Sequence, residues 1–163
     1  RAFKEYGDEP KGGRLAREVV HRREHRPFAV SDDLVGAIRA VLGPRSGPGD
    51  FARLFQAVRI AVNDELGAIE RALPAAFAAL SKGGVLCAIS FHSLEDRIVK
   101  QFIAKHAKDE YDRRAPFAAP KVMKLKALDR IKPSEVEVKG NPRSRSAIMR
   151  VAVRSATAPG TRA

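Results

Sequence analysis

Residues 83–100 constrain the fold of this chain more than any other stretch. Two glycines precede an apolar run from Val85 to Phe91, which contains almost no polar residue. Such a run is typical of a strand that is buried on both faces, as in parallel sheets. The letters SLED at 93–96 have the spacing of a capping box, which starts a helix. The pattern predicts a buried parallel strand that leads directly into a helix.

The junction between this strand and this helix is the predicted location of a functional site. Open α/β sheets bind their ligands at the carboxyl ends of their strands. His92 and Ser93 follow the strand at that end. Glu95 and Asp96 come next, and we interpret them as helix-start residues favoured by the helix dipole.

The rest of the chain divides into helical and extended patterns. Apolar residues at helical spacing predict helices over 14–24, 31–42 and 50–73, a break at Pro74, and a short helix over 75–80. Alternating residues predict an edge strand in 121–131, and 147–154 predicts a further strand. Residues 132–135 predict a capped helical turn, 108–120 a loop and 155–163 a disordered tail.

The excess of positive charge indicates a class of partner. The chain has 31 Lys plus Arg against 19 Asp plus Glu, a formal net charge of +12. Polyanions are the matching partners, although basicity alone separates DNA, RNA and acidic membranes poorly. No apolar stretch has the length that crosses a bilayer, and residues 1–5 lack the apolar centre of a signal peptide. We expect a soluble, cytoplasmic protein without a membrane partner.

Cysteine and histidine usage argues against disulfides and metal. Cys87 is the chain's only cysteine and lies inside the predicted strand, so we expect a small core side chain there. The histidines are scattered without the ligand spacing of a zinc site: His21, His25, His92 and His106.

Two predicted helices carry polar faces that have two interpretations each. In 14–24 the face could bind phosphate or could be a solvated basic face; it holds Arg14, Arg17, His21 and Arg22. In 50–73 the face could line a polar cleft or could be an exposed polar stripe; it holds Gln56, Arg59 and Asn63.

Three longer motifs carry a family resemblance. The letters are FQAVRIAVNDEL at 55–66, ISFHSLEDRIVK at 89–100 and NPRSRS at 141–146, and YGDE at 6–9 is a shorter match. Together and in this order they resemble the signatures of the bacterial ribosomal RNA small subunit methyltransferase H family. The resemblance covers 3–154 and corresponds to the carboxyl-terminal portion of that family.

The resemblance implies a fold and a domain organisation. It implies an α/β fold, an incomplete doubly wound (Rossmann-like) class I methyltransferase sheet with a helical insertion domain. Residues 1–49 would be part of the insertion, which recognises substrate, 50–74 a connecting helix, and 75–154 the carboxyl-terminal part of the methyltransferase domain. The glycine-rich loop that binds the cofactor belongs to the family's amino-terminal part, so we expect no cofactor-binding residue in this chain and no activity from it alone.

The resemblance also implies an activity and site residues. Family members transfer a methyl group from S-adenosylmethionine to the exocyclic N4 of a cytidine in 16S ribosomal RNA, so the expected partner is that RNA or its ribosomal subunit. Catalytic candidates are His92, as a general base, with Ser90 and Ser93. Candidates for binding RNA are Arg59, Asn63, Asn141, Arg143, Ser144 and Arg145.

Other interpretations stay open from the sequence. The chain could be a non-catalytic RNA-binding module or fragment, and a DNA-binding role has only the +12 charge in its favour. If part of the sheet is missing, its exposed edge predicts self-association.

Overall fold

The computed structural model describes residues 1–107 and 124–155. The chain forms two compact units, Arg1–Glu65 and Leu66–Ala163. Each unit has its own hydrophobic core. The unit boundary falls inside the stretch 50–74, for which the sequence predicts a connecting helix.

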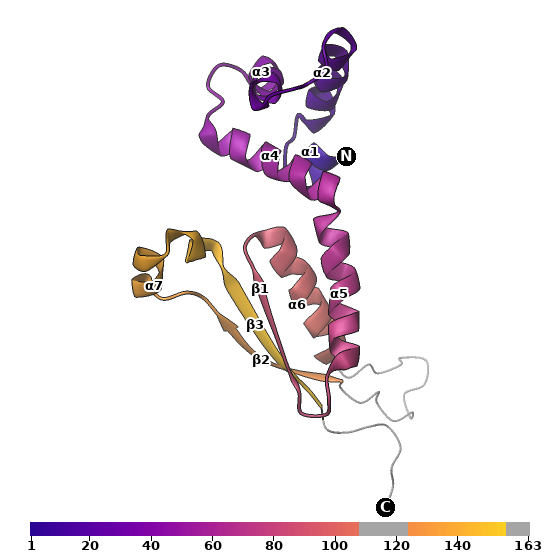
Figure 1. The fold of residues 1–163 in the computed structure, drawn as a ribbon, viewed down its shortest axis with the longest axis vertical. Helices are drawn as coiled ribbons and strands as arrows, with labels where there is room; N and C mark the ends of the chain where they lie inside the picture. Colours follow the sequence, from indigo (N-terminus) through magenta and orange to yellow (C-terminus); the bar gives the residue numbers. More distant parts are fainter. Residues whose placement is uncertain (108–123, 156–163) are drawn as a thin grey trace, which may run out of the picture. The chain divides into compact units, whose positions relative to one another are not determined.

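The first unit is a small helical assembly (Figure 1). It contains α1 (Ala2–Glu5), α2 (Gly12–His25), α3 (Ser31–Leu42) and α4 (Pro48–Asn63). Their apolar stripes meet in one core, which is formed by Leu15, Leu34, Ala37, Ile38, Val41 and Leu54. The helical periodicity of 14–24 and 31–42 therefore predicts these elements correctly, because each helix buries one apolar face.

Carboxylates in the first turn cap the starts of α3 and α4. Asp33 accepts hydrogen bonds from the backbone N–H groups of Ala29 and Val30, at 2.8 and 3.0 Å. Asp50 accepts one from Gly47 at 3.2 Å. Both residues satisfy donors that a helix start leaves unpaired.

The predicted break at Pro74 is wrong. α4 ends at Asn63, its C-cap Asp64 adopts a left-handed conformation with φ 49°, and α5 (Glu65–Ala79) then runs through Pro74. A residue at positive φ cannot continue an α-helix, so the chain turns at Asp64. Proline removes one hydrogen-bond donor and favours a kink, but here it does not end the helix.

The second unit combines helices with a three-stranded sheet (Figure 1). β1 (Val85–Ser90) and β2 (Leu125–Ile131) flank β3 (Ile148–Arg154), and both pair with it antiparallel. α6 (Ser93–Ala107) follows β1, while α7 (Glu135–Gly140) and the 3-10 helix η1 (Pro142–Ser146) connect β2 to β3. The core of this unit consists of Leu73, Leu86, Val99, Ile103, Leu125 and Ala152.

The prediction of a parallel strand buried on both faces is wrong for β1. Its side chains alternate: Leu86 is 8% exposed, whereas Val85 and Ile89 are 52% and 60% exposed. α6 packs on one face, and nothing among the described residues covers the other. Cys87 lies on the uncovered face and is exposed, so its predicted place in the core is also wrong.

The described fold is mixed α/β, mostly helical, with this small antiparallel sheet. The doubly wound sheet stays a prediction for a longer protein. The strands predicted in 121–131 and 147–154 are confirmed, and the capped turn at 132–135 becomes α7, with Ser134 as its N-cap. The predicted loop 108–120 and, beyond Ser155, the predicted tail lie outside the described residues. No helix in 1–107 or 124–155 has both the length and the hydrophobicity to cross a membrane.

Candidate functional site

One end of the sheet gathers most of the predicted site residues. Ser90, the last residue of β1, pairs with Ile148, the first residue of β3. His92 and Ser93 therefore leave the sheet at the end where η1 enters it. This end of the sheet, with residues 90–93 and 141–146, is called the loop end below.

His92 makes the local contacts of a helix cap. Its Nδ1 lies 3.4 Å from the backbone N–H of Glu95, which donates to it. In return, the Glu95 carboxylate accepts from the backbone N–H groups of Phe91 and His92, at 2.8 and 3.4 Å. This is the reciprocal arrangement of a capping box, with histidine in the place of serine or threonine. The predicted role of Glu95 as a helix-start residue is confirmed.

Both ring nitrogens of His92 are enclosed at this cap. The His92 Nε2 lies 3.3 Å from a carboxylate oxygen of Glu95 without hydrogen-bond geometry, and the side chain is 14% exposed. In this conformation Nδ1 is occupied by the cap, and Nε2 is buried without a hydrogen-bond partner among the described residues. The role of His92 as a general base stays a prediction, and it requires the imidazole ring to rotate out of the cap.

The two serines of the predicted catalytic group differ in exposure. Ser90 is 3% exposed and ends β1. Ser93 is exposed and is the first residue of α6. Of the two, only Ser93 presents its side chain to solvent.

The NPRSRS motif forms η1 and its cap. Ser144 is 7% exposed and donates its hydroxyl hydrogen to the Asn141 carbonyl at 2.8 Å, so it stabilises the turn. Asn141, Arg143 and Arg145 are exposed. Exposed guanidinium groups on a short, fixed turn suit phosphate oxygens. The motif therefore divides into one structural serine and three residues that are accessible to a ligand.

Arg59 and Asn63 belong to the first unit, where Glu65 holds them. Arg59 donates to the Glu65 carboxylate at 2.8 and 3.2 Å, and Asn63 donates to it at 3.4 Å. The predicted polar face of 50–73 is thus a local hydrogen-bonded cluster around the turn at Asp64. Arg59 and Asn63 lie in the first unit, and the loop end lies in the second.

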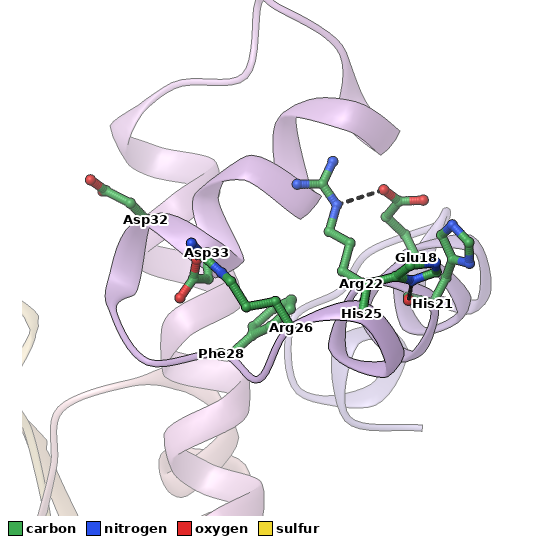
Figure 2. A pocket seen from close by; sticks show the side chains of 8 residues that line it. All are labelled: Glu18, His21, Arg22, His25, Arg26, Phe28, Asp32 and Asp33. Atoms are coloured by element: carbon green, nitrogen blue, oxygen red, sulfur yellow. Dashed lines mark hydrogen bonds and ion pairs between the residues drawn. The ribbon is translucent and has the colours of Figure 1, made fainter.

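A cavity of about 510 Å³ lies beside the predicted basic face of α2. Figure 2 shows Arg22 directed at Glu18, which it contacts at 2.7 Å, and His21 beside His25 on the same helix. Arg26, also in the cavity, pairs with Asp33. With Asp32 in the lining as well, carboxylates outnumber guanidiniums. This balance does not favour phosphate binding in the cavity, whose lining does not include Arg14 and Arg17 of the predicted face.

Sequence reasoning missed the ion pair between Asp96 and Arg150. The two Arg150 hydrogen bonds to Asp96 are the largest cause of a lowered Asp96 carboxyl pKa, and Asp96 in turn raises the pKa of Arg150. The residues are 54 positions apart. No local pattern predicts such a contact, because it depends on β3 packing against α6.

Known proteins match nearly the whole chain. The profile of the MraW methylase family matches residues 1–155. Proteins named ribosomal RNA small subunit methyltransferase H are 53% identical over 155 residues in Variovorax paradoxus and 54% identical over 158 residues in Polaromonas naphthalenivorans. These alignments cover 94% and 96% of this chain, and 50% and 52% of those relatives.

A third relative matches a shorter region more closely. The protein of the same name from Gemmatimonas aurantiaca is 70% identical over 95 residues, which is 58% of this chain and 30% of that relative. The chain spans about half the length of the curated relatives that it matches. Because the family profile covers residues 1–155, this chain belongs to the MraW methylase family.

Proposed function

We propose that the chain is part of an enzyme that methylates the exocyclic N4 of a cytidine in 16S ribosomal RNA, with S-adenosylmethionine as the methyl donor. The observation that carries this proposal is the family match over residues 1–155, together with relatives that are named for small-subunit ribosomal RNA methylation. A ribosomal RNA substrate places the enzyme in the cytoplasm.

The loop end is the proposed RNA-facing part of this chain. Arg143 and Arg145 are exposed there, and Asn141 offers an amide for a phosphate or a base edge. A base in structured RNA must leave its stack before its Watson–Crick edge is accessible. Cations on the fixed η1 turn would hold the flanking backbone while the base is displaced.

The chemistry needs alignment more than acid or base strength. The N4 lone pair of cytosine is delocalised into the ring, so its attack on a methyl group depends on close positioning. Ser93, and Ser90 if the end of β1 opens, are the proposed contacts to the base. His92 caps the start of α6. We also propose that it accepts the proton that leaves N4.

The described residues do not fit S-adenosylmethionine. Nucleotide-type cofactors bind to a glycine-rich loop between a strand and a helix. Gly12 and Gly13 open α2 after Lys11, with no strand before them. Gly83, at φ 76°, and Gly84 form the turn that precedes β1 rather than one that follows a strand. We therefore assign cofactor binding to a part of the enzyme outside this chain.

A chimera tests the proposal. The part of the Variovorax paradoxus relative that this chain does not match is joined to this chain and expressed in a strain that lacks its own methyltransferase H. Mass spectrometry of 16S ribosomal RNA then reports N4 methylation of cytidine. We expect methylation from the chimera and none from the chain alone.

Two outcomes would contradict this account. A folded chimera that binds S-adenosylmethionine but leaves the RNA unmodified would favour the non-catalytic RNA-binding module. Methylation by the chain alone would show that cofactor binding is wrongly assigned.

The open edge of β1 supports self-association of the chain in isolation. β1 lies at one edge of the described sheet and contains neither charge nor proline, the devices that usually protect an edge strand. Two copies can pair through this edge by backbone hydrogen bonds, which need no complementary side chains. We infer that the isolated chain dimerises through β1.

A further inference from the structure

The second unit also has a shallow groove, whose lining includes none of the loop-end residues 90–93 and 141–146. Its volume is about 240 Å³, and it runs between α6 and the strands β2 and β3. The apolar side chains of Ile103 and Val151 contribute to it, and its charged residues are Lys100, Asp129, Arg130 and Arg150. These six residues define the α6–β2 groove.

Like charges meet across the strands of this groove. Arg130 of β2 stands directly opposite Arg150 of β3 in the sheet register. Like charges in that relationship destabilise a sheet unless a counter-charge is present. Asp96 supplies one, but both of its carboxylate oxygens are bonded to Arg150. Among the described residues, no carboxylate forms an ion pair with Arg130.

Lys100 adds a second cation at the same place. The lowered pKa of Asp96 has contributions from Arg130 and Lys100 after that of Arg150, so all three cations act on one carboxylate. In 1–107 and 124–155 no carboxylate lies within ion-pair distance of Lys100 or Arg130. Among the described residues, three cations thus lie near two carboxylates, Asp96 and Asp129.

An irregularity in β2 places Arg130 in this cluster. The register with β3 shifts between Ala127 and Arg130, so the strand bulges over Leu128 and Asp129. A bulge bends the strand and redirects the side chains that follow it. Here the residue after the bulge joins a like-charged neighbour rather than a carboxylate.

We propose that the α6–β2 groove is a second RNA contact that binds a backbone phosphate between Lys100 and Arg130. Both side chains are exposed and can reach a phosphate, and the apolar wall accommodates the adjoining ribose. Such contacts position RNA without reading its sequence. The inference rests on the proposed function only for its choice of RNA as the polyanion.

The test measures RNA binding and not methylation. The affinity of the chain for unmodified 16S ribosomal RNA is measured between 50 mM and 200 mM salt, for the native chain and for Lys100→Gln/Arg130→Gln. We expect the double variant to bind roughly tenfold more weakly at low salt, with a log–log salt slope smaller by about 1. Asp129→Asn should bind about two- to threefold more tightly, since it removes a repulsive carboxylate near the phosphate.

A charge-matched control isolates the groove. Lys4→Gln/Lys82→Gln removes two positive charges from exposed residues outside it. The proposal is wrong if this control loses as much affinity and slope as the groove variant, or if the groove variant binds RNA like the native chain. It is equally wrong if the groove variant binds inorganic phosphate more weakly but RNA as tightly as the native chain does, because the groove then binds a small anion rather than RNA.

The result is independent of the methylation test. A chimera without methylation activity, combined with groove-dependent RNA binding, would reject the enzyme and keep the groove. Methylation by the chimera, combined with native-like RNA binding by the groove variant, would keep the proposed enzyme and reject the groove as an RNA contact.

Discussion

Arg150 donates two hydrogen bonds to the two carboxylate oxygens of Asp96, at 2.7 and 2.9 Å, and so joins strand β3 to helix α6. The Arg150 and Asp96 side chains are only 16% and 14% exposed. A bidentate pair with this little exposure is held by geometry as well as charge. It stabilises the packing of α6 on the one covered face of the sheet.

Replacing Asp96 by Ala should destabilise the second unit. The change leaves the mostly buried Arg150 guanidinium without its partner and opposite Arg130, and losing one member of such a pair costs roughly 3 kcal/mol. Hydrogen exchange of β3 and α6 amides measures the loss. Glu5→Ala is the control, because the Arg1–Glu5 pair is exposed to solvent and should contribute little to stability. Equal losses in the two variants would contradict a special role for Asp96.

Acid should weaken the same contact. Hydrogen bonds from Arg150 lower the Asp96 pKa, and backbone N–H groups lower those of Asp33 and Asp50. A carboxyl group with a lowered pKa in the folded state stabilises the fold fully above its unfolded pKa of about 3.9. That stabilisation is lost as pH falls through the folded value. Unfolding free energies at pH 6 and pH 3 should therefore differ less in Asp96→Asn than in the native chain.

His92 variants should separate capping from catalysis. His92→Asn keeps a side-chain acceptor at the start of α6, whereas His92→Ala removes it and should cost about 1 kcal/mol. If His92 acts only as a cap, the Asn variant of the chimera retains methylation and stability. Lost methylation with native thermal stability in His92→Asn would instead assign His92 to the chemistry.

Gly7 should tolerate no side chain. A Cβ at this position would lie 2.7 Å from the Phe3 carbonyl oxygen and within 3.2 Å of Leu54 and Ala57 side-chain atoms. Gly7→Ala should destabilise the first unit by about 1–3 kcal/mol, as overpacking does. Gly13→Ala is the matched control, because nothing lies within 4 Å of that position and alanine favours a helix. Hydrogen exchange of the α1 and α4 amides should be faster in Gly7→Ala than in the native chain and unchanged in Gly13→Ala.

Dimerisation through β1 should be visible by crosslinking. Cys87 lies in the middle of β1 and is exposed, so antiparallel pairing of two β1 edges brings two copies of it close together. A short bismaleimide should trap a covalent dimer, and Ile89→Lys should abolish it by placing a charge on the strand. Cys87→Ser should still dimerise on size-exclusion chromatography without crosslinking. A monomer at all concentrations would contradict the inference.

The local elements were predictable because local signals encode them. The helices that begin at Ser31 and Ser93 and the strand over 147–154 follow from periodicity. The predicted capping box of Ser93 and Asp96 is wrong by one residue, because His92 and Glu95 form it. The loop end was also predictable, since the strand-to-helix junction at His92 and the NPRSRS motif are both visible in the sequence. The role of the YGDE motif was not: Glu9 is 5% exposed and pairs with Arg53 at 2.8 Å, so the motif holds α4 in the first unit.

The sequence by itself determined the family, the order of helices and strands, and the location of the exposed arginines near the end of the sheet. These depend on residues that are close along the chain or on whole motifs. Only the tertiary structure decided that β1 pairs antiparallel, that Cys87 is exposed, and that Arg150 meets Asp96 while Arg130 does not. Strand direction and ion-pair choice depend on which distant segments pack together, and an apolar run such as 85–91 is compatible with either sheet type.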